Sequence, residues 1–519
     1  MTNQTGYIVY ATDSVGTALG EIEPGAIRLL GEPGDGHVTA VEHIPFGHKF
    51  ALRALRAGDP VIKYGASARP RRISFPVSMC ICITCAATLT SAPQRWTPRP
   101  PCRRTSSMNC TEEENAMEAT PICQAWLRPD GGKGIRNKVL VLYTVECSKH
   151  VAESIAAHFQ AQHRDVDVTG SLACLDNQAV VQRMLAYCVH PNVGAVLIVG
   201  HGCEYIEPDR IRDFARAHGR PAEAFYLQKV GGTEAGIALG CRLVGEMLEK
   251  IEAGPRAPMY AHELIIGAKC GGSDFTSGIA GNAVIGKFFE NLTAAGGTAM
   301  MEEIAEAVGL RDHLVSRAVN EDVARDVGLT YDKTMEFCRR LGRYSISPGN
   351  FVGGLTTIEE KSMGAVVKMG GCRIEGVLKI AQRPKHPGFW LLDVIPDDKP
   401  EPAFFFGGDA TGLLDQIACG CHLVLFNTGR GHVGGTPVAP ILKLTGNQET
   451  FDMLSHDIDF CAGSVLTGAE TKAEAAERLW GLIQRICNGE QVHAERVGHR
   501  QGTLFFNYQD PRRVVPCRY

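Results

Sequence analysis

From residue 134 onward, short apolar runs alternate with longer amphipathic stretches, and most of the apolar runs end in glycines. The apolar runs include KVLVLYTV at 138–145, GAVLIVGHG at 194–202, ELIIGAKCGGSD at 263–274 and HLVLFNTGRGHVGG at 422–435. Between them, the stretches at 148–163 and 233–253 have the apolar spacing of helices. Strands that alternate with helices predict an α/β architecture whose sheets are mostly parallel. Because ligands bind such sheets at the carboxyl ends of the strands, the glycine-rich loops mark the expected site.

The chain has 519 residues, which is more than one hydrophobic core organises, so two or three domains are expected. Residues 6–65 consist of short apolar runs separated by Gly, Pro and Asp, a pattern typical of a small β-rich unit. We therefore expect the following division of the chain: a β-rich domain at 1–65, an anomalous linker at 66–123, an α/β domain at 124–262 and a second α/β domain at 263–519.

Charge and hydropathy exclude several classes of partner. The net charge is -4, which predicts no general affinity for nucleic acid or for an anionic membrane surface. No apolar run is long enough to cross a bilayer, and the first residues, MTNQTGYIVYATDS, lack the pattern of a secretory signal. We expect a cytoplasmic enzyme that acts on a small molecule, and its sequence is compatible with a homo-oligomer.

Four loops combine glycines with reactive side chains, namely GHGCE at 200–204, KCGGSDFTSG at 269–278, SPGNFVGGLTTIEEKSMG at 347–364 and NTGRG at 427–431. None has the spacing of a phosphate-binding loop. Their glycines allow backbone amides to approach an anion. Arg430 follows an apolar strand and suits bidentate recognition of a carboxylate, whereas a solvated surface arginine is the alternative.

The same loops carry acid–base groups and metal-binding groups. Glu359, Glu360 and Lys361 offer a general base or metal ligands, although three charges at a helix start are often only solvated. Further side chains could ligate a divalent cation, with buried thiols and a capping aspartate as the alternative; these are Cys203, Glu204, Cys270 and Asp274. Most other cysteines stand singly in apolar or glycine-rich surroundings and are expected to be small buried hydrophobes; these include Cys174, Cys188, Cys241, Cys338 and Cys461.

Several long strings closely resemble the altronate/galactarate dehydratase family. They are GIRNKVLVLYTVEC, VLIVGHGCE, KCGGSDFTSGIAGN, SPGNFVGGLTTIEEKSMG and LVLFNTGRGHVGGTPVAPILKLTGN. The resemblance covers essentially all of residues 126–515. The N-terminal unit resembles the small SAF-type domain of that family through EHIPFGHKFALRALRAGDPVIKYG at 42–65, and GHKFAL with VIKYG is closer to the altronate branch than to the galactarate branch.

The resemblance implies a metal-dependent hydro-lyase that removes water from a sugar acid and yields a 2-keto-3-deoxy acid. It implies a divalent metal, Fe(II) or Mn(II), and a sugar-acid substrate. A carboxylate clamp, a base and stabilisation of the carbanion charge are then needed. We assign catalysis to Glu359, Glu360, Lys361 and Arg430, and metal binding to Cys203, Glu204 and Cys270. Substrate binding is assigned to Gly271, Gly272, Ser273, Asp274, Thr356, Thr357, Thr428 and His48.

Two departures from the family pattern leave the substrate open. After GRG the altronate and galactarate enzymes usually continue with Thr-Pro, whereas this chain has His432, Val433 and Gly434. The segment GSLACLDN at 170–177 stands where relatives carry a histidine, and only Cys174 survives from that motif. A sulfolactate-type sulfo-lyase, a galactarate dehydratase and a catalytically impaired sugar-acid binding protein are therefore the alternatives to an altronate-type dehydratase.

A third departure lies between the first two domains. Residues 66–110 contain seven Arg, six Pro and five Cys but no Lys, and no acidic residue stands between Asp59 and Glu112. In the family, VIKYG precedes a His-x-His-x-His string that suits a metal or a substrate. Here PVSMCICIT stands in its place. Some choices of codons for this string, translated in a shifted reading frame, would encode His-Val-His-Leu-His-His. We interpret 66–123 as a frame-shifted stretch, with a basic linker as the alternative.

Overall fold

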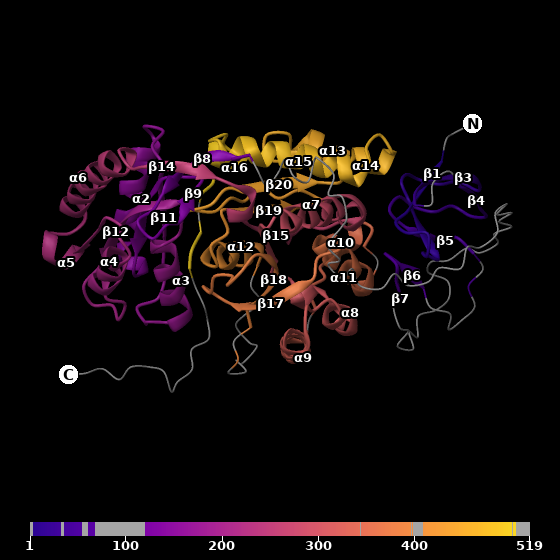
Figure 1. Cartoon of the computed structure of the whole chain (residues 1–519), viewed down its shortest axis with the longest axis horizontal. Coiled ribbons are helices and arrows are strands. Elements are labelled where there is room, and N and C mark those ends of the chain that lie inside the picture. The colour runs from indigo at the N-terminus through magenta and orange to yellow at the C-terminus, as the bar shows by residue number, and fades with distance from the viewer. Residues whose placement is uncertain are drawn as a thin grey trace. The chain divides into compact units, whose positions relative to one another are not determined.

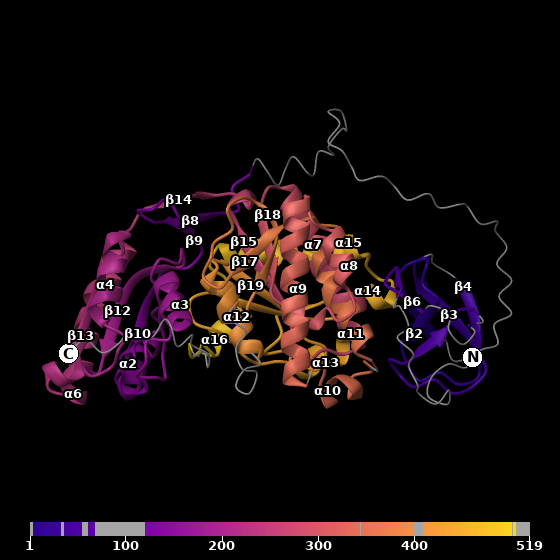
Figure 2. The same cartoon turned by 90° about the horizontal axis from the view of Figure 1, so that it is seen from below.

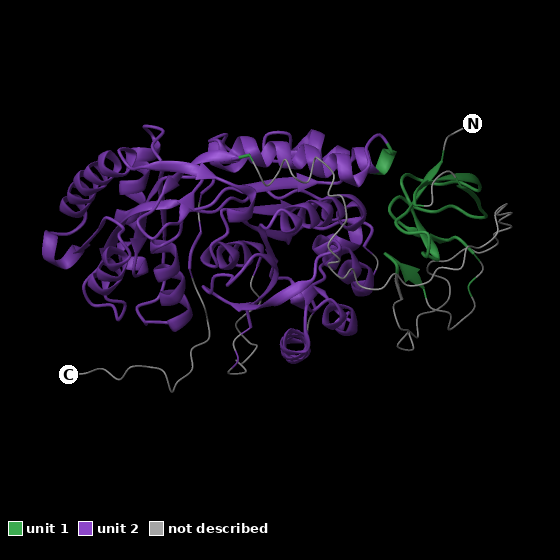
Figure 3. Cartoon of the chain, viewed as in Figure 1, with its two compact units in different colours: residues 1–120, 466–468 green, residues 121–465, 469–519 purple. Residues whose placement is uncertain are grey.

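The computed structural model describes residues 4–32, 36–53, 55, 61–67, 120–342, 344–355, 357–395, 397, 408–500 and 502–504. The chain divides into two compact units, which Figure 3 distinguishes by colour. The smaller consists of Met1–Thr120 with Leu466–Gly468, and the larger of Pro121–Val465 with Ala469–Tyr519. Most of the anomalous stretch, 68–119, lies outside the described residues, whereas Cys123 is buried in a strand of the larger unit.

The smaller unit is a five-stranded sheet in the order β4-β3-β1-β2-β5, with a short hairpin of β6 and β7. Its core gathers around Phe50, whose ring lies so close to Gly6 and Gly16 that a Cβ atom at either glycine would come within 2.6 Å of it. The expected β-rich unit is confirmed. Its strands are β1 (Thr5–Ile8), β2 (Val15–Ala18), β3 (Gly25–Gly31), β4 (Gly36–Ala40), β5 (Lys49–Ala51), β6 (Ile62–Lys63) and β7 (Ala66–Ser67).

The first part of the larger unit contains a four-stranded, wholly parallel sheet in the order β11-β10-β12-β13. All eight residues of β12 are buried, as expected of a parallel strand with helices on both faces. Helices α2 and α6 share one core with the sheet, and α3 and α4 contribute to another on its opposite face. The elements are β10 (Lys138–Tyr143), α2 (Glu146–Gln160), β11 (Val166–Gly170), α3 (Gln178–Cys188), β12 (Val193–Gly200), α4 (Pro208–Ala217), β13 (Ala222–Tyr226), α5 (Leu227–Val230) and α6 (Thr233–Glu252).

A second parallel sheet of seven strands, in the order β17-β18-β16-β15-β19-β20-β21, forms the rest of the larger unit (Figures 1 and 2). Neighbouring side chains of β18 point to opposite faces: Phe389 packs against Phe289 of α7, and Trp390 joins the core that contains Leu414 of α12. The strands are β15 (Ile265–Cys270), β16 (Thr298–Met301), β17 (Ile374–Lys379), β18 (Gly388–Asp393), β19 (Leu423–Asn427), β20 (Ile441–Thr445) and β21 (Phe460–Cys461).

Helices and one small sheet complete this part. The larger helices are α7 (Asn282–Ala294), α9 (Glu321–Leu341), α12 (Asp409–Ala418) and α15 (Lys472–Cys487). The shorter ones are α8 (Arg311–Ser316), α10 (Pro348–Val352), α11 (Ile358–Val366), α13 (Gln448–Met453), α14 (Ser464–Thr467), α16 (His493–Arg496), η1 (Ala261–Glu263), η2 (Ser277–Gly281), η3 (Ile304–Glu306) and η4 (Val367–Met369). An antiparallel sheet joins β8 (Cys123–Leu127), β9 (Lys133–Gly134) and β14 (Arg256–Met259). No helix in the described ranges combines the length and apolarity needed to cross a membrane.

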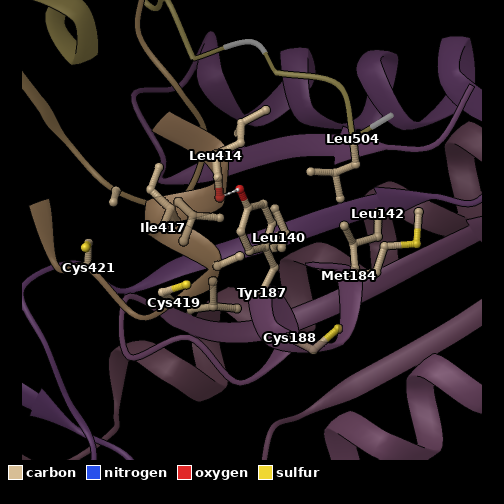
Figure 4. Close-up of a cluster of buried hydrophobic side chains, with 14 of the residues drawn as sticks. Leu140, Leu142, Met184, Tyr187, Cys188, Leu414, Ile417, Cys419, Cys421 and Leu504 are labelled. Atoms are coloured by element: carbon tan, nitrogen blue, oxygen red, sulfur yellow. Dashed lines mark hydrogen bonds between the residues drawn. The ribbon is translucent and has the colours of Figure 1, made fainter. Parts of the chain in front are cut away.

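One hydrophobic core links the two parallel sheets (Figure 4). Leu140 and Met184 of the first part pack in the same cluster as Leu414 and Ile417 of α12, and the hydroxyl of Tyr187 donates a hydrogen bond to the Leu414 carbonyl at 2.8 Å. The predicted α/β class with mostly parallel sheets is therefore confirmed. Because each parallel sheet has its own helices, we propose 124–262 and 263–519 as two domains of the larger unit.

Buried polar groups also cross between these two domains. The Nδ1 atom of His422 accepts from the backbone N–H of Ile265 at 3.0 Å, and its Nε2 lies 3.0 Å from the Lys133 carbonyl. Only a neutral ring with its proton on Nε2 satisfies both bonds. Burial lowers the pKa of His422 to about 4, although the bond to Lys133 opposes this effect. His190 lies near His422, and burial lowers the pKa of His190 as well.

We predict that acid weakens this fold through His422. A histidine whose folded pKa lies below its unfolded value near 6.5 favours folding above that pH, and this contribution is lost as the pH falls toward 4. The expected loss for this group is about 2–3 kcal/mol in the free energy of unfolding. Urea unfolding between pH 7 and pH 4 measures it. In His422→Asn the loss should be smaller, whereas the exposed control His150→Asn should behave like the parent; equal slopes in all three would contradict the assignment.

Candidate functional site

The carboxyl ends of three adjacent parallel strands meet at one edge of the seven-stranded sheet. β15 pairs with β16 on one side and with β19 on the other, with Ala268 opposite Met301 and Cys270 opposite Asn427. The loops that follow these strands are 271–274, 302–306 and 428–431, and helices α10 and α11 contribute further groups. A side chain at Gly271 would force its neighbours to shift, because a Cβ atom there would lie 2.2 Å from Oδ2 of Asp409 and 2.7 Å from Cζ of Phe426.

Lys269, the next-to-last residue of β15, is the centre of a buried ionic network. Its Nζ lies 2.5 Å from Oε1 of Glu302, 3.4 Å from Oε1 of Glu303 and 3.7 Å from Oδ1 of Asp409. Burial alone would lower the pKa of Lys269, but Glu302 and Glu303 outweigh it and raise the pKa well above the usual value. Burial raises the pKa of Glu302 and also that of Asp409. The network therefore combines a fixed ammonium group with carboxylates that hold protons more readily than usual.

Two further lysines reach the same cluster. Lys368 of η4 pairs with Glu303 and donates to the Sγ of Cys270 at 2.9 Å, and Lys361 of α11 lies 2.7 Å from Oε1 of Glu306. Burial would raise the pKa of Glu303, but Lys368 and Lys269 reverse the effect and lower it to about 2. The carboxylate of Glu303 is thus held ionised, although it is 3% exposed.

Cys270, Glu303 and Glu306 could hold a metal ion. Their ligand atoms lie within 4.8 Å of one another and all three residues are buried; no other such group of three occurs in the described part of the chain. One sulfur and two carboxylates suit a borderline divalent ion such as Fe(II) or Mn(II). Burial, followed by the charge of Glu303, raises the pKa of the Cys270 thiol to about 12, so the thiol must lose its proton to act as a ligand. Lys368 bonds to two of these three groups, and a cation would compete with it.

The loop after β15 and the loop after β19 are held against each other. The backbone N–H of Arg430 donates to the Gly272 carbonyl at 2.9 Å, and its Nη1 donates to the carbonyl of Gly349 in α10 at 3.0 Å. Gly272 has a φ of 59°, a left-handed conformation that glycine adopts readily. Thr428 accepts from the Gly431 N–H at 3.1 Å. These bonds place the exposed Arg430 side chain over α10.

Ser273 and Asp274 differ in how their side chains are satisfied. Oδ1 of Asp274 accepts from the side chains of Thr276 and Ser277, and Oδ2 accepts from Asn447 at 3.0 Å. The hydroxyl of Ser273 is buried and has no hydrogen-bond partner. A buried unpaired hydroxyl is costly, so this atom is suited to a ligand oxygen. Asp274, in contrast, is occupied in fixing the loop.

The structure brings some of the predicted site residues together and separates others. Cys270, Lys361 and the loop 271–274 share the edge described above. Glu360 is buried at the start of α11, Glu359 beside it is half-buried, and Thr357 caps that helix by accepting from the Glu360 N–H. Cys203 and Glu204 lie apart from this edge, because they follow β12 of the four-stranded sheet. His48 belongs to the smaller unit, where it precedes β5, and Thr356 lies outside the described residues.

Sequence reasoning missed most of the ionic network. Glu302, Glu303 and Glu306 come directly after β16, yet TAMMEEIAE carries no glycine-rich loop and was not singled out. Two adjacent acids at the end of an apolar strand were the available signal. Lys368 and Asp409 gave none, since each lies far along the chain from the residues it contacts.

Fold and site together define an α/β enzyme with a buried ammonium–carboxylate site at a parallel sheet edge. Comparison with family models gives three matches: the SAF domain of altronate/galactarate dehydratase at residues 6–68, the D-galactarate dehydratase/altronate hydrolase second domain at 125–252, and the D-galactarate/altronate dehydratase C-terminal domain at 261–509. The chain therefore belongs to the altronate/galactarate dehydratase family and is a hydro-lyase enzyme.

Three curated relatives agree with this family. The chain is 31% identical over 393 residues to the (2R)-sulfolactate sulfo-lyase subunit beta of Chromohalobacter salexigens, an alignment that covers 74% of this chain and 96% of the relative. It is 28% identical to the altronate dehydratase of Escherichia coli, in an alignment that covers 96% of this chain and 98% of the relative. It is 27% identical to the galactarate dehydratase (L-threo-forming) of Escherichia coli, with 87% of each chain covered.

The buried network yields a prediction about stability. Replacing Lys368 by Met leaves the carboxylate of Glu303 buried with one cationic partner fewer, and breaking a buried pair in this way costs about 3–5 kcal/mol. Urea unfolding should show this loss, and Glu303→Gln in the same chain should recover part of it. The half-buried pair of Lys287 with Glu290 is the control, because Lys287→Met should cost less than about 1 kcal/mol. Additive effects in the Lys368 and Glu303 double-mutant cycle would contradict the pairing.

Proposed function

We propose that this chain is an altronate-type dehydratase that removes water from a sugar acid and releases a 2-keto-3-deoxy acid, with Fe(II) or Mn(II) as cofactor. The buried lysine–carboxylate network at the carboxyl edge of β15, β16 and β19 is the observation that carries the proposal. Elimination of water next to a carboxylate develops negative charge on that carboxylate, and preorganised cations in a dry site stabilise such charge strongly.

The lysines and the carboxylates suit different roles. The pKa of Lys361 is raised, because the pairing with Glu306 outweighs the effect of burial, so its amine is protonated and suits charge stabilisation or proton donation to the departing hydroxyl. Removal of the α-proton then falls to a carboxylate. Glu302 and Asp409, whose pKa values burial raises, are stronger bases than ordinary carboxylates, and we assign them this step together with the sequence-predicted Glu359 and Glu360.

Substrate recognition is assigned to the loops after β15 and β19. The unpartnered hydroxyl of Ser273 would bind a substrate oxygen, and the guanidinium of Arg430, whose Nη1 is bonded to the Gly349 carbonyl, would bind a carboxylate as a fork. Cys270, Glu303 and Glu306 would hold the metal, which supplies polarisation of the departing hydroxyl when bound.

A turnover screen tests the proposal. Altronate, galactarate, other aldonates and sulfolactate are incubated with the full chain, with Fe(II), with Mn(II) and with a chelator, and 2-keto acid and sulfite are measured. We expect 2-keto acid from altronate, dependence on metal and no sulfite. Thermal stabilisation by the sugar acids without turnover in any metal would contradict the proposal and support a binding protein.

A sulfo-lyase is the second candidate function. The relative at 31% identity carries that name, and this chain has His432 where altronate and galactarate enzymes usually have Thr-Pro. His432 packs against Phe426 with the ring centroids 4.5 Å apart, and burial lowers the pKa of His432, although the charge of Asp409 opposes this effect. A neutral histidine at this edge of the site is suited to donate a hydrogen bond to a second anionic group. Sulfite release from sulfolactate in the screen would support this function.

The assignment of Arg430 predicts a specific kinetic defect. Arg430→Lys keeps the charge but loses the fork that binds a carboxylate bidentately, so kcat/KM should fall by at least about tenfold, which corresponds to about 1.4 kcal/mol. Steady-state kinetics on the substrate found in the screen measures the change. Arg242→Lys on the exposed face of α6 is the control and should leave kcat/KM unchanged. Unchanged kinetics in Arg430→Lys would reject the clamp.

A further inference from the structure

Three exposed thiols gather at the carboxyl edge of the four-stranded sheet. The structure describes thirteen cysteines, all free, and among these the exposed ones are Cys147, Cys174 and Cys203. The prediction that Cys174 is a buried hydrophobe is therefore wrong, because this residue lies in a surface loop. Exposed free thiols are reactive and are usually avoided unless they are used. Three exposed thiols at one sheet edge therefore suggest a functional site.

Parallel pairing brings the three thiols to the same edge. Cys147 is the fourth residue after the end of β10, Cys174 the fourth after β11, and Cys203 the third after β12. These strands are adjacent, and their ends are in register, with Tyr143 opposite both Gly170 and Val199. In the order β11-β10-β12, the chain leaves β10 for one side of the sheet and later returns to its other side. The topological switch point therefore lies between β10 and β12, and ligands of such sheets bind at this point.

Hydrogen bonds fix the three loops to one another. The Tyr205 N–H donates to the Cys174 carbonyl at 2.8 Å, which joins the loops after β11 and β12. The hydroxyl of Thr144 donates to Oε1 of Glu204 at 2.6 Å, which joins the loops after β10 and β12. Glu204 also accepts from the N–H groups of His201 and Gly202. Its carboxylate is thus engaged in holding the loops and leaves metal binding to the thiols.

The surroundings favour an anionic, sulfur-ligated centre. Cys147 is the second residue of the 15-residue helix α2, whose N-cap Val145 supplies no side-chain hydrogen bond, so the first-turn amides and the positive end of the helix face this edge. The Nδ1 atom of His201 is buried without a hydrogen-bond partner. A ring nitrogen in this state is suited to a hydrogen bond with a bound group.

The spacing of the thiols distinguishes between kinds of metal centre. A single zinc ion with bonds of about 2.3 Å would draw three sulfur atoms to within about 4 Å of one another. Within the described ranges, Cys270, Glu303 and Glu306 form the only group of three residues whose ligand atoms all lie within 4.8 Å of one another. At least one pair of the thiols of Cys147, Cys174 and Cys203 is therefore more than 4.8 Å apart, which disfavours a single ion and is compatible with thiols that bind different irons of a polynuclear cluster.

We propose that Cys147, Cys174 and Cys203 bind a [4Fe–4S] cluster through three thiolates. Three protein thiolates leave one iron of such a cluster without a cysteine ligand, and this iron is open to an oxygen ligand. The site is distinct from the cluster of Cys270, Glu303 and Glu306, and its occupancy does not depend on which acid the enzyme dehydrates.

Anaerobic reconstitution of the full chain with iron salts, sulfide and a thiol reductant tests the proposal. We expect about four iron and four sulfide per chain, visible charge-transfer absorption, and an electron paramagnetic resonance signal after reduction. Cys147→Ser, Cys174→Ser and Cys203→Ser should each lose most of the bound iron and sulfide. Cys241→Ser is the matched control, since Cys241 is a free, half-buried cysteine on α6 of the same domain and should leave the cluster intact.

Three outcomes would overturn the proposal. The first is iron bound without stoichiometric sulfide, and the second is a full cluster in all three serine variants. The third is a disulfide between two of the three cysteines that persists in the anaerobically purified protein and leaves no iron after reconstitution. Circular dichroism and thermal unfolding of each variant separate loss of the cluster from loss of the fold. These measurements require no substrate, so they fail or succeed independently of the proposed dehydratase activity.

Discussion

Parallel pairing of the strands is the constraint on which the rest of this enzyme depends. In both large sheets every strand runs in the same direction, so each sheet has one edge at which all strand ends and their loops meet. The seven-stranded sheet places the lysine–carboxylate network at such an edge, and the four-stranded sheet places three exposed cysteines at another. Residues more than a hundred positions apart in the chain become neighbours only through this arrangement.

The buried network illustrates how charge is accommodated in the interior. Lys269, Lys361 and Lys368 are each less than a tenth exposed, and each has a carboxylate partner. Buried pairs contribute little net stability compared with apolar groups of the same size, yet removing one partner is costly. Such a network is therefore better understood as a preorganised electrostatic environment than as a device for stability. It is also the environment that elimination next to a carboxylate requires.

The two proposed α/β domains belong to one compact unit, and the contacts between them are both apolar and ionic. The core around Leu140 and Leu414 is continuous across them, and Arg136 makes a bidentate pair with Glu495 near the end of the described chain. The Nζ atom of Lys138 lies 3.7 Å from Oε1 of Glu495, so the carboxylate has a second cation nearby.

The sequence by itself determined the α/β class, the strands and the loops after β15 and β19, because uninterrupted apolar runs and glycines report local structure directly. It also indicated Cys270 and Lys361, since both stand in glycine-rich or polar motifs. It could not show that Glu303, Glu306 and Lys368 surround them, because those contacts depend on strand order. Nor did it show that Cys147, Cys174 and Cys203 share an edge. Strand order and register are decided by packing between distant segments, and only the tertiary structure contains that information.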